Sequence, residues 1–375
     1  MTAPMASDAD FAVCRAICER HGTTYALATR LLPPGRRRAV WALYAWARIV
    51  DDHVDLDDGV ASPVTDARAA RERIDRLRAG LSELLSDASL AGDRPVGGDR
   101  GAPAMSLLPD VEAAVVRAAG ATVTELDIDH GLLTDFLDSM LMDLPGGETH
   151  VTRYRTWAEL DRYMWGSACV IGLQMIPVLG LRPGADGAAA ARHAAALGRA
   201  FQVTNFLRDV AEDLDRDRVY LPLDEWAAFG VDEDRLRACR ELGRADARVK
   251  AAVAHFISLN RAMYREADPG IPMLAQPASR AIRTARVLYS GILDEIERAD
   301  LDVFAGRAVV PNRRRAAVAL PNAAAGITGF AGAAIARRSR NAVTALTAPN
   351  ARNAQRSRNT GRVHELPVTT KGHAP

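Results

Sequence analysis

Apolar side chains recur every three or four residues through most of the 375-residue chain, which is the spacing of one face of an α-helix. No alternating strand pattern runs for more than a few residues. We therefore predict an all-α protein. The expected helices cover about residues 8–20, 36–55, 64–87, 110–118, 126–142, 156–180, 187–214, 232–265 and 274–299.

Two segments interrupt the helical pattern. Residues 89–104 are rich in Gly, Pro and Asp, so we expect a flexible surface insertion between helices and not a domain boundary. Residues 311–375 are rich in Ala, Arg, Asn and Thr and poor in large apolar side chains, which is typical of a disordered tail. The predicted organisation is one folded domain, residues 1–310, followed by this tail.

Charge and composition favour neither nucleic acid nor a membrane span. The 48 Lys and Arg residues nearly balance the 47 Asp and Glu residues, so no global field attracts nucleic acid. The N-terminus has early acidic residues and no basic segment or long apolar run, so we expect no signal peptide and a cytoplasmic protein. The uncharged stretch 316–336 is too weakly apolar to predict a membrane helix.

Two acidic segments carry the candidate chemistry. In LYAWARIVDDHVDLDD, polar residues spaced four, three and four apart share one stripe of a helix: Tyr44, Arg48, Asp51 or Asp52, and Asp55. In GRAFQVTNFLRDVAEDLDRDRVYLP, polar residues spaced three, four and four apart do the same: Gln202, Asn205, Asp209 and Asp213. Two such helices facing each other would line a cavity with carboxylates at one mouth.

Hard cations relieve the repulsion between such carboxylates. Mg²⁺ takes one or two of them and leaves its other positions to water and substrate phosphate. Nearby arginines are placed to bond the phosphate oxygens that remain: Arg48, Arg208, Arg216 and Arg218. The pattern thus favours metal and diphosphate chemistry, with two solvated helix ends as the alternative. His53, inside the first acidic segment, is expected to face solvent.

These segments resemble the squalene and phytoene synthases, which join two isoprenoid diphosphates head to head. Matching blocks lie at residues 23–55, 163–180, 198–222 and 283–307, and include TTYALATRLLPPGRRRAVWALYAWARIVDDHVD and RTARVLYSGILDEIERADLDVFAGR. The resemblance implies an all-α fold of the isoprenoid synthase type, a helical bundle around a central apolar cavity.

The resemblance also implies roles for single residues. Two DxxxD motifs, Asp51 with Asp55 and Asp209 with Asp213, would hold Mg²⁺ or Mn²⁺, with Asn205 as a further ligand. The residues that would hold the diphosphate or trigger its loss are Arg48, Arg208, Arg218, Tyr289 and Arg307. Those that would line the reaction centre or the cavity wall are Tyr25, Tyr44, Tyr163, Gln202 and Asn205.

The block YMWGSACVIGLQMIPVLG is most similar to bacterial phytoene synthases. The resemblance therefore implies a phytoene synthase of carotenoid biosynthesis that joins two geranylgeranyl diphosphates, without NADPH. A squalene or dehydrosqualene synthase using farnesyl diphosphate is the alternative, and a non-catalytic scaffold relative is a more remote one. Expected partners are the prenyl diphosphates and a downstream phytoene desaturase, with peripheral membrane contact and no nucleic acid.

Overall fold

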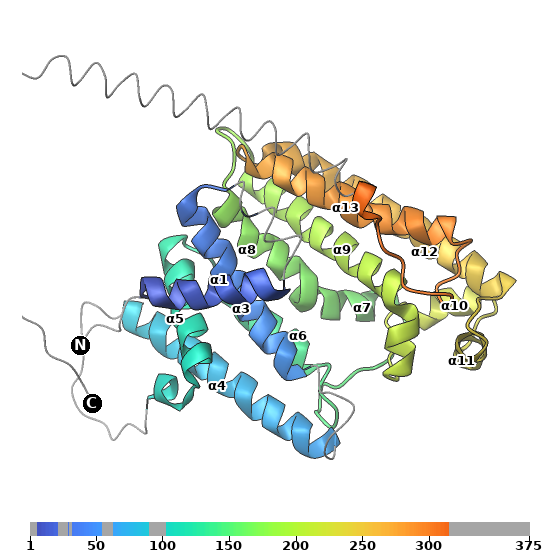
Figure 1. Cartoon of the computed structure of the whole chain (residues 1–375), viewed down its shortest axis with the longest axis horizontal. Helices are drawn as coiled ribbons and strands as arrows, with labels where there is room; N and C mark the ends of the chain where they lie inside the picture. Colours follow the sequence, from blue (N-terminus) through green and yellow to red (C-terminus); the bar gives the residue numbers. More distant parts are fainter. Residues whose placement is uncertain (1–5, 22–28, 30–31, 55–62, 90–102, 315–375) are drawn as a thin grey trace, which may run out of the picture. The chain divides into compact units, whose positions relative to one another are not determined.

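The computed structural model describes residues 6–21, 29, 32–54, 63–89 and 103–314, all of which lie in one unit of the chain, Met1–Gly326. These residues form helices, two isolated β-bridges and no strand, so the all-α prediction is confirmed (Figure 1). The α-helices are α1 (Asp8–His21), α3 (Pro34–Val54), α4 (Pro63–Ser89), α5 (Asp110–Glu125), α6 (Gly131–Leu141), α7 (Trp157–Met164), α8 (Val170–Leu179), α9 (Gly187–Asp215), α10 (Leu223–Ala228), α11 (Glu233–Glu241), α12 (Ala247–Ala267) and α13 (Ala278–Arg298). Shorter helical turns are η1 (Ala104–Leu107), η2 (Trp165–Cys169) and η3 (Asp268–Met273).

Two predicted helices are divided in the structure. The helix expected at 232–265 is α11 followed by α12, because Gly243 adopts a φ of +61° and Asp246 then accepts two backbone N–H groups of the first turn of α12. The helix expected at 156–180 is α7 and α8 with a π-helical turn, η2, between them. The six residues of α10 were not predicted, since so short a helix shows no clear period.

The predicted insertion at 89–104 and tail at 311–375 lie largely outside the described residues, and both stay predictions. At the start of the tail, Arg314 contacts Asp294 of α13 at 2.5 Å. Arg314, within the range predicted as a tail, therefore packs against the helical domain. Within the described ranges, no helix is both long and apolar enough to cross a membrane.

The buried apolar side chains form two clusters. The first comes mainly from α1, α3, α4, α5, α6 and α8 and includes the fully buried Trp46 and Leu137. The second comes mainly from α7 and α9 to α13 and includes Trp226 and Phe256. Helix α9 contacts α8 of the first cluster and α12 and α13 of the second, so it joins the two halves of the bundle.

Glycines allow α9 to lie close to α8 and η2. A Cβ atom on Gly172 would lie 2.3 Å from the carbonyl oxygen of Ala194, and one on Gly198 would lie 2.4 Å from that of Ala168. Neither distance is compatible with a packed interior, so only glycine permits this helix spacing. The same helices form one wall of a cavity inside the bundle.

Candidate active site

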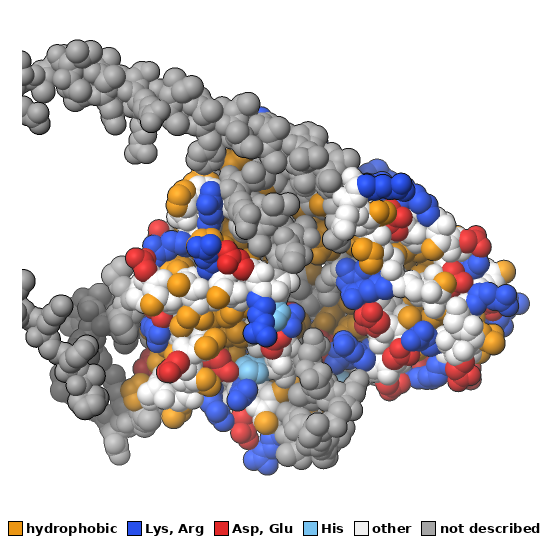
Figure 2. All heavy atoms as spheres, in the orientation of Figure 1, with side chains coloured by type: hydrophobic (Ala, Val, Ile, Leu, Met, Phe, Trp, Pro, Cys, Tyr) orange, Lys and Arg blue, Asp and Glu red, His pale blue; other side chains and the backbone are white. Residues whose placement is uncertain are grey.

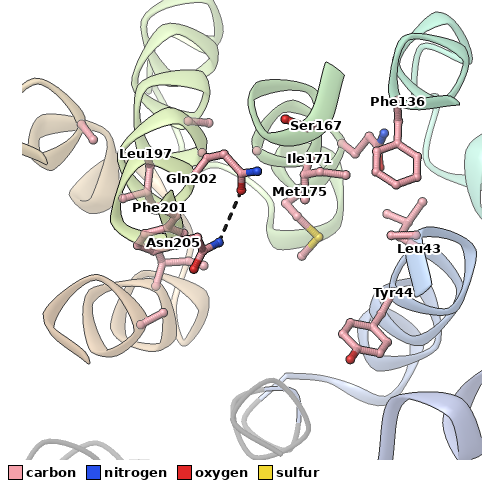
Figure 3. Close-up of a pocket in the computed structure, with 18 of the residues that line it drawn as sticks. Leu43, Tyr44, Phe136, Ser167, Ile171, Met175, Leu197, Phe201, Gln202 and Asn205 are labelled. Carbon is pink, nitrogen blue, oxygen red and sulfur yellow. Dashed lines mark hydrogen bonds between the residues drawn. The ribbon is translucent and has the colours of Figure 1, made fainter. Parts of the chain in front are cut away.

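A cavity of about 680 Å³ lies between the two apolar clusters. Its lining residues come from α3, α6, α7, η2, α8, α9, α12, η3 and α13, together with nearby loops. Figure 3 shows Tyr44 of α3 and Phe136 of α6 on one side, Phe201 and Asn205 of α9 on the other, and Met175 of α8 between them. A volume of this size is typical of a small-molecule site.

The cavity wall formed by α9 changes from apolar to charged along the helix. Its lining residues between 190 and 201 are Ala, Leu, Gly and Phe, apart from one histidine. The amide and charged members follow, in the order Gln202, Asn205, Arg208, Asp209 and Asp213. At 1.5 Å per residue, the wall from residue 190 to residue 213 is about 35 Å long.

Helix α3 shows the same order of polarity. Leu43 precedes Tyr44 in the lining, and Asp51 follows about two turns later. Asp52 forms a hydrogen bond and ion pair with Arg48 and is not part of the lining. The structure therefore places Asp51 at the cavity and Arg48 beside Asp52.

Asp209 lies between two arginines. Arg208 bonds both carboxylate oxygens, with Nε to Oδ1 at 2.8 Å and Nη2 to Oδ2 at 2.5 Å. Arg307, from the segment after α13, donates its Nε to Oδ1 at 2.9 Å. Two cations are thus held at the acidic end of α9, where an anionic group of a ligand would meet them.

Asp213 lies one helical turn beyond Asp209. Burial, and next the charge of Asp209, raises the pKa of Asp213 to about 7, although Arg218 and Arg216 act in the opposite direction. A carboxylate in this environment is disfavoured in its charged form near neutral pH. A bound cation would relieve that cost.

The polar atoms on α9 suit a divalent metal that the substrate helps to bind. Asn205 Oδ1 is buried and accepts no hydrogen bond, while Asn205 Nδ2 donates to Gln202 Oε1 at 3.4 Å. Among the described residues, no three His, Cys, Asp or Glu side chains lie close enough to hold a metal ion by themselves. Mg²⁺ does not need such a cluster, because it retains water and phosphate ligands. Asp55 lies outside the described residues, so its predicted role as a ligand stays a prediction.

A second buried carboxyl group in the cavity wall is Asp143, which follows α6 and is 4% exposed. Tyr163 donates its hydroxyl to Asp143 Oδ2 at 2.7 Å, and Tyr220 donates to Oδ1 at 3.1 Å. Arg218 Nη2 donates to the backbone oxygen of Asp143 at 3.1 Å. Burial raises the pKa of this carboxyl. The structure thus joins Tyr163 and Arg218, two predicted site residues, through an aspartate that the sequence did not single out.

Two further predicted residues lie apart from the lining or outside the described ranges. Tyr289 of α13 stacks on Phe201, a cavity residue, with 4.4 Å between ring centroids. Tyr25 falls in a range that the structure does not describe. Their predicted roles stay predictions.

Two other acidic residues, at and just beyond the end of α9, form surface ion pairs. Asp215 pairs with Arg240 at 2.7 Å, and Asp217 pairs with Arg153 at 2.6 Å. Figure 2 shows acidic and basic side chains interspersed over the described part of one face. These carboxylates are therefore separate from the cavity.

The prediction that His53 faces solvent is wrong. Its side chain is 13% exposed, and Nε2 lies 3.1 Å from Oε1 of Glu112 on α5. The packing of α5 against α3 covers this position. Local sequence carries no signal of a contact between residues so far apart in the chain.

Comparison with known proteins gives consistent matches. The model of the squalene/phytoene synthase family matches residues 18–314. The chain is 34% identical over 307 residues to the chloroplastic phytoene synthase of an Oncidium hybrid cultivar, a match that covers 80% of this chain and 65% of the relative. It is 30% identical over 314 residues to the 15-cis-phytoene synthase of Synechocystis, covering 81% of this chain and 82% of the relative. The chain thus spans just under two thirds of the length of the plant relative.

Solved structures with related folds include a dehydrosqualene synthase in complex with a ligand, at a TM-score of 0.64 and 22% identity. That match covers 84% of this chain and 96% of the other. A squalene synthase from Alicyclobacillus acidocaldarius matches at a TM-score of 0.60 and 22% identity, covering 80% and 97% of the two chains. At this identity the likeness concerns the fold, and it confirms the expected helical fold of the isoprenoid synthase type.

Proposed function

Since the chain belongs to the squalene/phytoene synthase family, we propose that it is a prenyl transferase that joins two geranylgeranyl diphosphates to form phytoene. The similarity to phytoene synthases over about four fifths of the chain supports this choice of substrate. The reaction needs no NADPH, and its product would enter carotenoid biosynthesis, where a phytoene desaturase would consume it.

The observation that carries the proposal is the change of polarity along the cavity. Apolar residues of α3, α6, α8 and α9 line one part, and Asp51, Arg208, Asp209 and Asp213 line the other. A prenyl diphosphate has the same two parts, a hydrocarbon chain and a charged head group. The cavity therefore offers each part of the substrate a matching surface.

The diphosphate would be held by arginines at the charged end. Arg208 and Arg218 line the cavity there, and Arg307 lies against Asp209. Guanidinium groups form paired, charge-assisted hydrogen bonds with phosphate oxygens. In these positions the arginines would orient the allylic carbon of the substrate towards the cavity interior.

The residues that would hold Mg²⁺ or Mn²⁺ are Asp51 of α3 and Asn205, Asp209 and Asp213 of α9, with Asp55 completing the first motif. When bound, the cation would neutralise the negative charge that develops on the departing diphosphate. The raised pKa of Asp213 and the unpaired oxygen of Asn205 support this assignment.

Catalysis would proceed through two ionisations. Loss of the first diphosphate leaves an allylic cation, which the 2,3 double bond of the second substrate attacks, and loss of a proton closes a cyclopropane. Loss of the second diphosphate gives a cation that rearranges to the central 1,1′ bond, and a second proton loss yields the triene. Apolar walls that include Leu43, Phe136 and Met175 would keep out water, which would convert either cation to an alcohol.

Identification of the hydrocarbon product tests the proposal. The purified protein is incubated with Mg²⁺ and either geranylgeranyl or farnesyl diphosphate, with and without NADPH. We expect forty-carbon phytoene from geranylgeranyl diphosphate without NADPH. A product from farnesyl diphosphate alone would instead indicate a thirty-carbon synthase, and no product from either substrate would indicate a non-catalytic relative.

A further inference from the structure

We propose that Asp143 is a positioning residue for proton transfer: it orients the Tyr163 hydroxyl and takes the proton of that hydroxyl when Tyr163 accepts one from the substrate cation. This inference rests on the proposed function, because a carbocation must lose a proton in that reaction.

The hydrogen bonds around Asp143 favour Tyr163 over Tyr220 as the acceptor. Both hydroxyls donate their proton to the Asp143 carboxylate. Each tyrosine oxygen can therefore still accept a hydrogen bond or a proton through its lone pairs. Arg218 Nη1 lies 3.5 Å from Tyr220 Oη and donates to it. Both tyrosines line the cavity, but the Tyr163 oxygen receives no such guanidinium bond among the described residues.

The burial of Asp143 points to a use for its charge. A carboxylate taken out of water loses several kcal/mol of hydration, which two hydroxyl hydrogen bonds offset only in part. An asparagine could accept and donate hydrogen bonds at the same place without that cost. Burial also raises the pKa of Asp143, which makes the carboxylate a better acceptor for the proton of a bonded hydroxyl.

The transfer balances in atoms and electrons. The C–H bond next to the cationic carbon breaks, and its electron pair forms the new carbon–carbon bond. The released proton bonds to Tyr163 Oη while the original hydroxyl proton moves to Asp143 Oδ2, 2.7 Å away. Tyrosine is unchanged, Asp143 becomes neutral, and its proton passes to solvent after the product leaves.

The nearby Tyr154 provides a matched control. Its ring lies 5.7 Å from that of Tyr163 and 6.0 Å from that of Tyr220, and it is 1% exposed. Its hydroxyl is buried with no hydrogen-bond partner and is not part of the cavity lining. Tyr154→Phe therefore removes a hydroxyl from the same cluster of tyrosine rings and leaves the proposed proton path unchanged.

The test is a double-mutant cycle on kcat and KM with the prenyl diphosphate that the wild-type protein converts. Asp143→Asn and Tyr163→Phe should each lower kcat by about 10²-fold or more while KM changes less than about threefold. The double variant should be no slower than the slower single variant, because both changes break one path. Tyr154→Phe should keep the wild-type kcat.

Three results would overturn the inference. Near-normal kcat for Asp143→Asn would show that the residue has only a structural role. If the fold-losses in kcat of the two single variants multiply in the double variant, Asp143 acts on the cation through space and not through Tyr163. If Asp143→Asn does not fold, a near-normal kcat of Tyr163→Phe would also overturn the inference. In each case wild-type turnover leaves the proposed function intact, whereas a wild-type protein that forms no hydrocarbon overturns both.

Discussion

At the level of single residues, the cavity holds carboxyl groups whose charge opposes folding. Burial and the neighbouring Asp209 raise the pKa of Asp213 from 3.8 to about 7. Between about pH 4 and pH 7 the folded protein therefore binds a proton that the unfolded chain does not. This residue destabilises the metal-free protein above pH 7, and the effect is relieved as the pH falls towards 4.

Replacing Asp213 with asparagine should reverse that penalty. We expect Asp213→Asn to stabilise the protein, in EDTA at pH 8, by on the order of 2 kcal/mol, because one pKa unit corresponds to about 1.4 kcal/mol and solvent screens part of the effect. The gain should shrink towards zero near pH 4. Thermal unfolding of both proteins across this pH range measures it.

Asp215→Asn is the control for this prediction. Asp215 lies two residues further along α9 and is half exposed, and its hydrogen bond to Arg240 lowers its pKa. Its replacement should destabilise slightly or not at all, and the small loss should be greatest above pH 4. If Asp213→Asn unfolds at or below the wild-type temperature at pH 8, the charged Asp213 carboxylate does not destabilise the folded protein.

The sequence could predict which site residues share one face of a helix. It could not predict which residues of other helices reach the site. Helical spacing alone put Asn205, Asp209 and Asp213 on one stripe, and the structure keeps them at one cavity. Asp143 and Glu112 lie far along the chain from the groups they contact. Their positions depend on tertiary packing, of which local periodicity carries no signal.

At the level of helices, the site depends on the close packing of α8 against α9. Gly172→Ala would put a methyl group 2.3 Å from the Ala194 carbonyl oxygen, so the helices would have to separate. We expect a loss of about 1–3 kcal/mol in the free energy of unfolding, measured by urea denaturation.

Gly35→Ala is the matched control for this substitution. Gly35 lies in the first turn of α3, and a Cβ atom added to it would meet no other atom within 4 Å. Alanine there should leave stability unchanged or raise it by up to about 1 kcal/mol. Equal stability of the two variants would contradict the view that a glycine is needed where α8 meets α9.

The helices themselves were largely predictable, and their interruptions were less so. Long periodic segments such as α9 were found because an apolar face repeats through many turns. The break between α11 and α12 depends on one glycine and one capping aspartate, Gly243 and Asp246, within a continuous apolar pattern. Such local signals are weaker than periodicity and are easily passed over.

At the level of the whole molecule, the two apolar clusters leave a cavity of about 680 Å³ between them. Sequence spacing predicted two carboxylate stripes, and the resemblance to a known family predicted the fold around them. The extent of the cavity could not be predicted, because it depends on how α3, α6, α8, α9 and α13 pack together. Its polarity supports the proposal that the substrate is a prenyl diphosphate.

The most direct measurement is the hydrocarbon formed from geranylgeranyl diphosphate and Mg²⁺ by three proteins compared side by side: the wild type, Asp209→Asn and Asp215→Asn. Asp209 lines the cavity between two arginines, whereas Asp215 forms a surface ion pair on the same helix. We expect phytoene from the wild type and from Asp215→Asn. For Asp209→Asn we expect a loss of at least about 10²-fold, with the helical circular dichroism unchanged. Phytoene formation by Asp209→Asn at a near-normal rate, or none by the wild type, would show that the proposed role of the charged end of the cavity is wrong.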